Sequence, residues 1–187
     1  MKFYIAICFV IAFLNQSFSQ IDRQEALKAY EYLNKIRENP SKFSTELGVD
    51  LSKVNPANKL IWNDTLARVA EEKARDMATR NYFAHVNPDG KGINIMIHEA
   101  GYKLVDSWIN DPANNYFESL SAGSPTGVEG IMNLVIDEGV PGYGHRKHLL
   151  GISDFYANLT DIGIGFFKAS NSPYISYMCV IIAKRNW

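Results

Sequence analysis

The feature that most constrains this chain of 187 residues is an apolar run near its end, from Tyr174 to Ala183. Side chains alternate between the two faces of a strand, so each face can be read separately. A strand that is apolar on both faces needs a covering layer on each side of its sheet. Here one face carries Ile175, Tyr177, Cys179 and Ile181, and the other carries Tyr174, Met178, Val180 and Ile182.

A second strand is predicted just before this run, from Asp161 to Phe167, with glycines at positions 163 and 165. Much of the chain before it shows the apolar spacing of helices instead. Helices that precede strands covered on both faces predict an α+β chain, folded as a three-layer α-β-α sandwich.

The helical part divides into segments that begin at side chains able to cap a helix. Asp22 with Glu25, and later Thr126 with Glu129, fit capping boxes, and Asn63 or Asp64 can cap a helix between them. Lys73 falls inside the apolar stripe of one of these helices, where a charged residue is unexpected. Residues 102–125 show no clear period. We therefore expect helices over residues 22–39, 63–80, 93–100 and 126–138.

The first 19 residues differ in kind from the rest. Lys2 precedes an apolar run from Phe3 to Leu14, and Ser17 and Ser19 follow as small residues of a cleavage site. The apolar run is shorter than the ~20 residues of a membrane-spanning helix. The sequence therefore predicts a signal peptide over 1–19, one mature domain over 20–187, and a secreted or periplasmic protein with no transmembrane segment after cleavage.

Cysteine content and charge narrow the class further. Of the two cysteines, Cys8 falls in the predicted leader, so Cys179 remains alone and no intrachain disulfide can form. Its apolar surroundings predict a buried structural thiol. Without Lys2 the net charge is 18 − 20 = −2, and no basic stripe is present, which argues against a nucleic-acid partner.

Four positions combine reactive side chains with loop or helix-end contexts: His85, Glu118, Asp137 and His145, with Glu138 as the alternative to Asp137. Two imidazoles and two carboxylates suit a divalent metal such as Zn²⁺, or acid–base chemistry. Their separations of 33, 19 and 8 residues match no compact metal motif. From residue types alone, ordinary hydrogen-bonded or surface positions also stay open.

Several motifs occur in an order that resembles a known family. Residues 82–90, YFAHVNPDG, resemble an F-x-H-x-x-P-D-G stretch, and residues 144–150, GHRKHLL, resemble G-H-R-x-N-I-L. Residues 161–165, DIGIG, resemble the I-G-V-G strand that follows, and Glu118 lies where G-E-N is found. From about Ala26 to Ala183 the chain is thus similar to bacterial members of the CAP superfamily (cysteine-rich secretory proteins, antigen 5 and pathogenesis-related proteins; SCP domain).

The resemblance implies a CAP-type sandwich with a cleft lined by two histidines and two acids. His85 and His145 match the histidines, and Glu118 matches the first acid, although Phe117 and Ser119 replace the family's glycine and asparagine. The second acid is placed at Asp137, with Glu138 as the alternative. His148, which replaces an asparagine, and Tyr143 are further candidates for ligand contact, and Arg146 is expected in an ion pair.

Three functions are compatible with such a cleft. The first is an extracellular binding module for a metal ion or for a small apolar, lipid-like, peptide or glycan ligand. The second is a metal-dependent hydrolase in which a bound Zn²⁺ activates water, with Glu118 as general base and Asp137 as a further catalytic residue. The third is a structural protein whose polar network only holds loops in place. Binding is favoured over hydrolysis because no H-E-x-x-H helix places a general base beside metal ligands.

Overall fold

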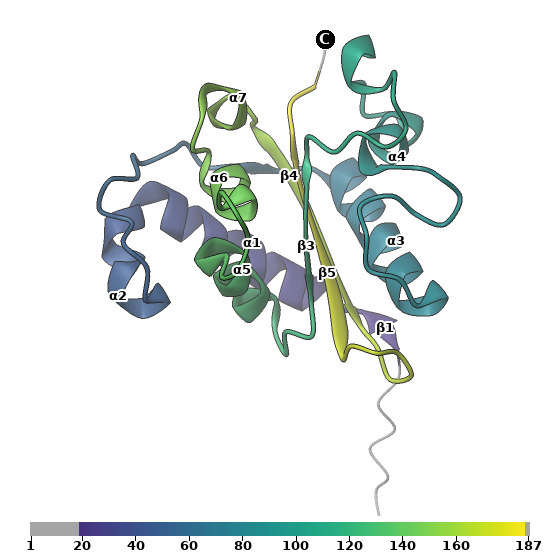
Figure 1. The fold of residues 1–187 in the computed structure, drawn as a ribbon, viewed down its shortest axis with the longest axis horizontal. Helices are drawn as coiled ribbons and strands as arrows, with labels where there is room; N and C mark the ends of the chain where they lie inside the picture. Colours follow the sequence, from purple (N-terminus) through teal and green to yellow (C-terminus); the bar gives the residue numbers. More distant parts are fainter. Residues whose placement is uncertain (1–18, 186–187) are drawn as a thin grey trace, which may run out of the picture.

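The computed structural model describes residues 19–185, so the predicted leader lies outside the described residues except for Ser19. One mixed sheet runs through the molecule (Figure 1). Its strand order is β1-β4-β5-β3, and β2 pairs parallel to β4 while the other neighbours are antiparallel. The strands are β1 Gln20–Ile21, β2 Ile61–Trp62, β3 Glu118–Ala122, β4 Asp161–Lys168 and β5 Ser176–Ala183.

Helices cover both faces of this sheet, as predicted. Helices α3 and α4 lie on one side, and α1, α2, α5 and α6 lie on the other (Figure 1). The predicted α-β-α sandwich is therefore confirmed. The helices are α1 Arg23–Glu38, α2 Ser44–Leu47, α3 Asp64–Arg80, α4 Ile93–Glu99, α5 Gly127–Ile136, α6 Gly144–Leu150 and α7 Asp154–Ala157, with 3-10 turns at Pro40–Phe43 and Asp106–Trp108.

The long helices begin where their caps predict. Asp22, Asn63 and Thr126 each accept a backbone N–H of the following turn. The reciprocal half of the first capping box is not formed, however. The Glu25 carboxylate accepts instead from the N–H of Gly127 at 2.9 Å, so it links α1 to the start of α5.

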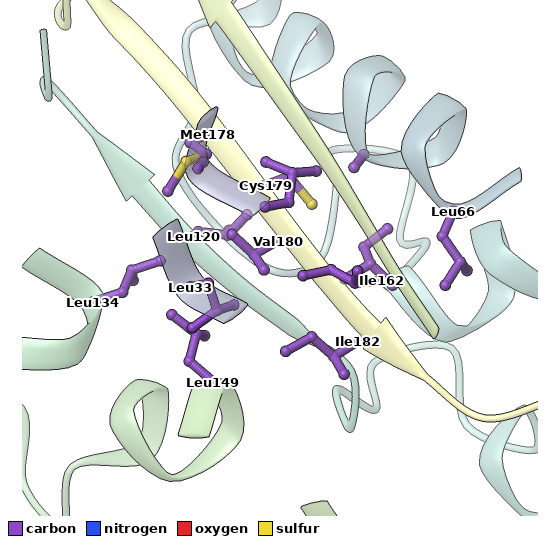
Figure 2. Packing of buried hydrophobic residues seen from close by; sticks show 14 of the residues in the cluster. Leu33, Leu66, Leu120, Leu134, Leu149, Ile162, Met178, Cys179, Val180 and Ile182 are labelled. Carbon is purple, nitrogen blue, oxygen red and sulfur yellow. The ribbon is translucent and has the colours of Figure 1, made fainter. Parts of the chain in front are cut away.

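Strand β5 forms the centre of the core. All eight of its residues are buried, and Leu33 and Leu134 approach from one side while Leu66 lies on the other (Figure 2). The strand begins two residues later than predicted, because Tyr174 and Ile175 are exposed in the turn before it. Cys179 is a buried free thiol, as expected.

Two glycines in β4 bring α3 close to the sheet. A methyl group added at Gly163 would collide with the backbone of Leu66 and Ala67, and one at Gly165 with that of Ala70 and Glu71. Glycine is needed at these positions for close approach, since any side chain would move the helix away.

Strand β3 was not predicted, and it interrupts the expected order of helices first and strands second. Three of its five residues, Glu118, Ser119 and Ser121, are polar and yet buried. Buried polar residues break the apolar alternation from which strands are recognised. None of the helices in residues 19–185 is both long and apolar enough to cross a bilayer.

Candidate functional site

The candidate residues converge at the free edge of the sheet, where β3 is the last strand. Successive side chains of a strand point to opposite faces. Glu118 pairs with Ile181, which pairs with Gly163, so Glu118 lies on the face covered by α3. Ser119 therefore lies on the opposite face, the one covered by α1, α5 and α6. The two helical layers thus meet across this strand.

His85 and Glu118 form the first polar pair of the site. His85 lies in the turn after α3, which ends at Asn81 in a left-handed conformation. Its Nδ1 is 2.7 Å from Oε2 of Glu118. The Glu118 side chain is fully buried, whereas the His85 ring is 42% exposed. The carboxylate therefore lies behind the ring, and the rest of the ring is accessible from outside.

Two further groups hold Glu118 in place. The Cys179 thiol donates to Oε1 over 3.3 Å, and burial, with the Glu118 charge adding to it, raises the pKa of that thiol. Asn115 accepts from the Glu118 N–H at 2.9 Å and donates to the Glu118 carbonyl at 3.1 Å. The Asn115 amide nitrogen also lies 3.0 Å from Nδ1 of His85.

His145 and Asp137 form a second pair of the same design. Nδ1 of His145 is 2.7 Å from Oδ1 of Asp137, and Oδ2 accepts from the Arg146 N–H at 3.2 Å. Asp137 ends α5 in a left-handed conformation, with φ of 53°, which turns its carboxylate back towards α6. Its side chain is 1% exposed and the His145 ring 26%. Glu138, the alternative acid, is exposed.

Arg146 links α6 to the end of α5 next to this second pair. Its guanidinium donates to the carbonyls of Val135, at 2.6 Å, and Ile136, at the end of α5. It therefore binds backbone carbonyls, where an ion pair was expected. Tyr143 stacks on the guanidinium at 4.2 Å and is 49% exposed, so its ring covers Arg146 rather than the cavity.

His148 differs from the other two histidines because no carboxylate lies behind it. It is buried, and its Nδ1 is 2.8 Å from the Ser119 hydroxyl. Burial lowers the pKa of His148 to about 3, although the Ile182 backbone opposes this shift, so the ring is neutral near pH 7. No described residue lies in hydrogen-bonding geometry to its Nε2.

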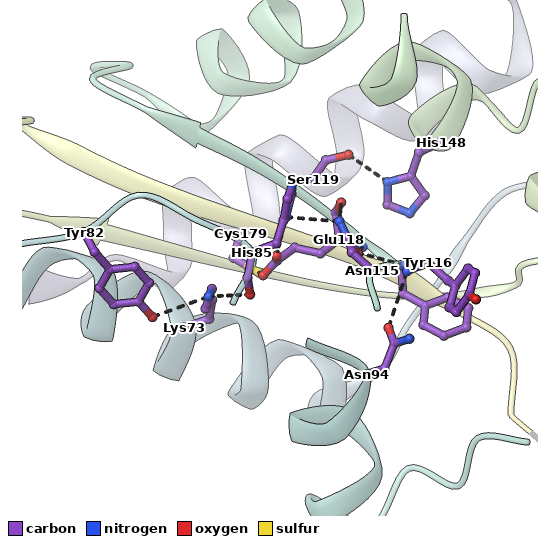
Figure 3. Close-up of polar contacts among 11 residues, drawn as sticks. Lys73, Tyr82, His85, Asn94, Asn115, Tyr116, Glu118, Ser119, His148 and Cys179 are labelled. Atoms are coloured by element: carbon purple, nitrogen blue, oxygen red, sulfur yellow. Dashed lines mark hydrogen bonds and ion pairs between the residues drawn. The ribbon is translucent and has the colours of Figure 1, made fainter. Parts of the chain in front are cut away.

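A cavity of about 170 Å³ opens between these groups. His85, Glu118, His145 and His148 line it, while Asp137 lies behind His145. Figure 3 shows how Glu118 and Ser119 reach away from β3 in different directions. A larger hollow of about 500 Å³ lies elsewhere, between residues 53–58 and 151–157, and holds none of these histidines. The other residues that line the 170 Å³ cavity are Asn115, Tyr116, Ser119, Val140, Gly144 and Tyr156.

The arrangement limits which metal ion could be held. Among residues 19–185, no three histidine, cysteine or acidic side chains are grouped so that they could hold a metal ion. Both carboxylates face Nδ1 atoms, so the remaining donors are the Nε2 atoms of His85, His145 and the buried His148, and these are not grouped closely enough to share one ion. Zinc sites in proteins use three or four protein ligands. The donor set therefore does not fit a resident zinc ion.

Fold and site together define a class: an α-β-α sandwich with two histidine–carboxylate pairs across an edge strand. A model of the CAP family (cysteine-rich secretory protein family) matches residues 30–182. This chain therefore belongs to that family.

Solved structures agree on the fold. An extracellular protein containing an SCP domain from Bacillus anthracis strain Ames aligns with a TM-score of 0.58 and 20% identity over 87% of this chain and 41% of that one. The chain thus spans less than half of that protein. An outer surface protein from Borrelia burgdorferi aligns with a TM-score of 0.58 and 20% identity over 90% of this chain and all of its own. No curated protein sequence matches.

Proposed function

We propose that the protein is an exported binding module whose cleft takes up one compact polar group of a ligand between His85 and His145. The observation that carries this proposal is that both rings line one cavity while each Nδ1 is bonded to a buried carboxylate. When a neutral ring donates Nδ1–H, its lone pair is on Nε2. Two such acceptors suit a group rich in O–H or N–H donors, as glycan and peptide segments are.

The size and walls of the cavity support a small polar group rather than a whole lipid. Pockets that enclose drug-sized molecules measure about 300–1,000 Å³, and this one measures about 170 Å³. The rings of Tyr116 and Tyr156 provide apolar wall, and Asn115 adds an amide. Among the described residues, no lysine or arginine lines the cavity, so it offers an anionic ligand no side chain with a permanent positive charge.

The position of Glu118 favours binding over hydrolysis. A general base must reach the proton that it removes, directly or through one water. The Glu118 side chain is fully buried, and its two oxygens are occupied by His85 and Cys179. Its geometry suits an acid that orients a ring.

Export is part of the proposal. It is supported by the apolar run from Phe3 to Leu14 followed by small residues. It is also supported by the fold neighbours, which are described as an extracellular protein and an outer surface protein.

The test is NMR of the histidine rings in the exported protein, titrated with a chitin oligosaccharide, a capped tripeptide and Zn²⁺ in separate samples. We expect one organic probe to shift the ring signals of both His85 and His145. The shifts should disappear in His85→Ala and His145→Ala and persist in His98→Ala, because His98 does not line the cavity.

Two outcomes would contradict the proposal. If only Zn²⁺ shifts both rings, the cleft is a metal site that draws its remaining ligands from solvent. If no probe shifts either ring while both alanine variants lose stability, the histidines serve only as a structural network.

A further inference from the structure

Lys73 is a buried lysine that the cleft itself does not use. It lies on the face of α3 that packs on the sheet, and none of its surface is exposed. Its charge interrupts an otherwise apolar stripe. Removing an ammonium group from water is costly unless other groups compensate. Its contacts therefore indicate what keeps a cation at this position.

The ammonium group is directed at the turn that carries His85 (Figure 3). Nζ donates to the carbonyl of His85 at 2.8 Å and to the hydroxyl of Tyr82 at 3.4 Å. It also lies 5.0 Å from the centre of the Tyr82 ring. The Tyr82 hydroxyl in turn donates to Asp76 at 2.6 Å. Lys73 forms no ion pair within residues 19–185, so its shortest contact is with the backbone of the cleft histidine.

Lys73 and Glu118 act on the same buried layer between α3 and the sheet. The Cys179 thiol, which donates to Glu118 at 3.3 Å, is affected by both charges: burial raises its pKa most, the Glu118 carboxylate raises it further and the Lys73 ammonium lowers it. Lys73 does not line the cavity. Lys73 therefore supports the backbone of His85 from outside the cavity, while Glu118 supports the ring of His85.

We propose that Lys73 is the positioning residue of His85. By holding the His85 carbonyl it fixes the turn after α3, so that Nδ1 meets Glu118 and Nε2 faces the cavity. The Tyr82 hydroxyl accepts from the same ammonium group and is itself held by Asp76. The inference rests on the proposed function only in treating His85 as a residue that contacts ligand.

If Lys73 served only the fold, replacing it would change the stability of the protein and leave the His85 ring unaffected. Lys73→Met removes the cost of burying an ammonium group, but it also leaves the His85 carbonyl and the Tyr82 hydroxyl without their donor. These two effects oppose each other, so the variant should keep the fold, with a melting temperature close to that of the parent protein. What it removes is the donor to the His85 carbonyl, so the effect should appear at one ring.

The experiment measures the ring tautomers of all histidines by ¹⁵N NMR in the exported protein without any ligand. In the parent protein, His85 and His145 should each show a single Nδ1–H tautomer. In Lys73→Met, His85 should lose that single tautomer while His145, bonded to Asp137, keeps it. Lys73→Arg retains a charged donor and should restore much of the His85 signature. Lys103→Met, at an exposed lysine, is the matched control and should change neither ring.

A folded Lys73→Met protein with an unchanged His85 tautomer would overturn the inference. So would a change at His85 and His145 alike, since that indicates general loosening. Should Lys73→Met not fold, Tyr82→Phe decides: a change confined to His85 supports the inference, and no change overturns it. Because no ligand is present, failure here is distinct from failure of the titration with organic probes.

Discussion

The two histidine–carboxylate pairs form opposite walls of the cleft and have the same geometry, but different parts of the structure bring their residues together. On the sheet wall, His85 and Glu118 lie 33 residues apart and meet only because α3 packs on β4 and β5 and the turn after it reaches β3. On the helix wall, Asp137 and His145 lie eight residues apart and meet through one turn between α5 and α6. The helix wall is therefore set by local backbone, and the sheet wall by tertiary packing. Each wall should respond to mutation through the structure that builds it.

The largest effect is expected where the two walls meet, at the contact between His148 and Ser119. The unfolded chain takes up a proton on His148 below a pKa of 6.5, whereas the folded protein does so only near 3. Stability should therefore fall as pH is lowered through this window. A shift of one unit corresponds to about 1.4 kcal/mol, so about 3 kcal/mol should be lost between pH 6.5 and 4.

Urea unfolding of the parent protein and of His148→Asn at pH 7, 5.5 and 4 measures this loss. Carboxylates titrate in both proteins and cancel in the difference, so the parent should weaken relative to the variant as pH falls. A difference that stays constant with pH would show that His148 does not remain neutral in the folded protein.

The next largest effect is expected from Glu118→Ala on the sheet wall. It removes the acceptor of His85 and Cys179 and leaves a cavity, partly offset because a buried charge is removed as well. We expect a loss of about 2 kcal/mol, measured by urea unfolding, with a disordered His85 ring in NMR. Glu129→Ala on α5 serves as control. An ordered His85 in the variant would mean that Glu118 does not orient the ring.

The smallest effect is expected on the helix wall, from Asp137→Gly. Glycine tolerates the left-handed backbone, so only the hydrogen bonds to His145 and Arg146 are lost, at about 1 kcal/mol. Asp137→Ala should cost about 1 kcal/mol more, because alanine is strained at this φ. Glu138→Ala is the neighbouring control. If the Gly and Ala variants unfold at equal urea concentrations, backbone conformation does not contribute at this position.

The sequence was informative where local chemistry decides the structure. The capping residues Asp22, Asn63 and Thr126 fixed the starts of the long helices, and the apolar run containing Cys179 identified the central strand. The sequence did not predict β3, because a strand that buries Glu118 and two serines lacks the apolar alternation by which strands are recognised.

For the site, the residue types identified the histidines but not how they are arranged. That Asp137 rather than Glu138 lies behind His145 depends on a left-handed turn, which the sequence did not specify. Tyr156 enters the cavity from α7 without any recognisable motif. Asn115 belongs to the stretch without clear period, so its contacts with His85 and Glu118 could not be anticipated.

The glycines of β4 have a consequence for the width of the cleft. Gly163 and Gly165 allow α3 to rest on the strand backbone, and the turn after α3 carries His85. The thickness of this layer therefore sets how far His85 is from His145 on the opposite wall. Any side chain at position 165 would collide with the backbone of Ala70 and Glu71, so it would displace α3 and with it the turn that carries His85, without altering any residue that a ligand touches.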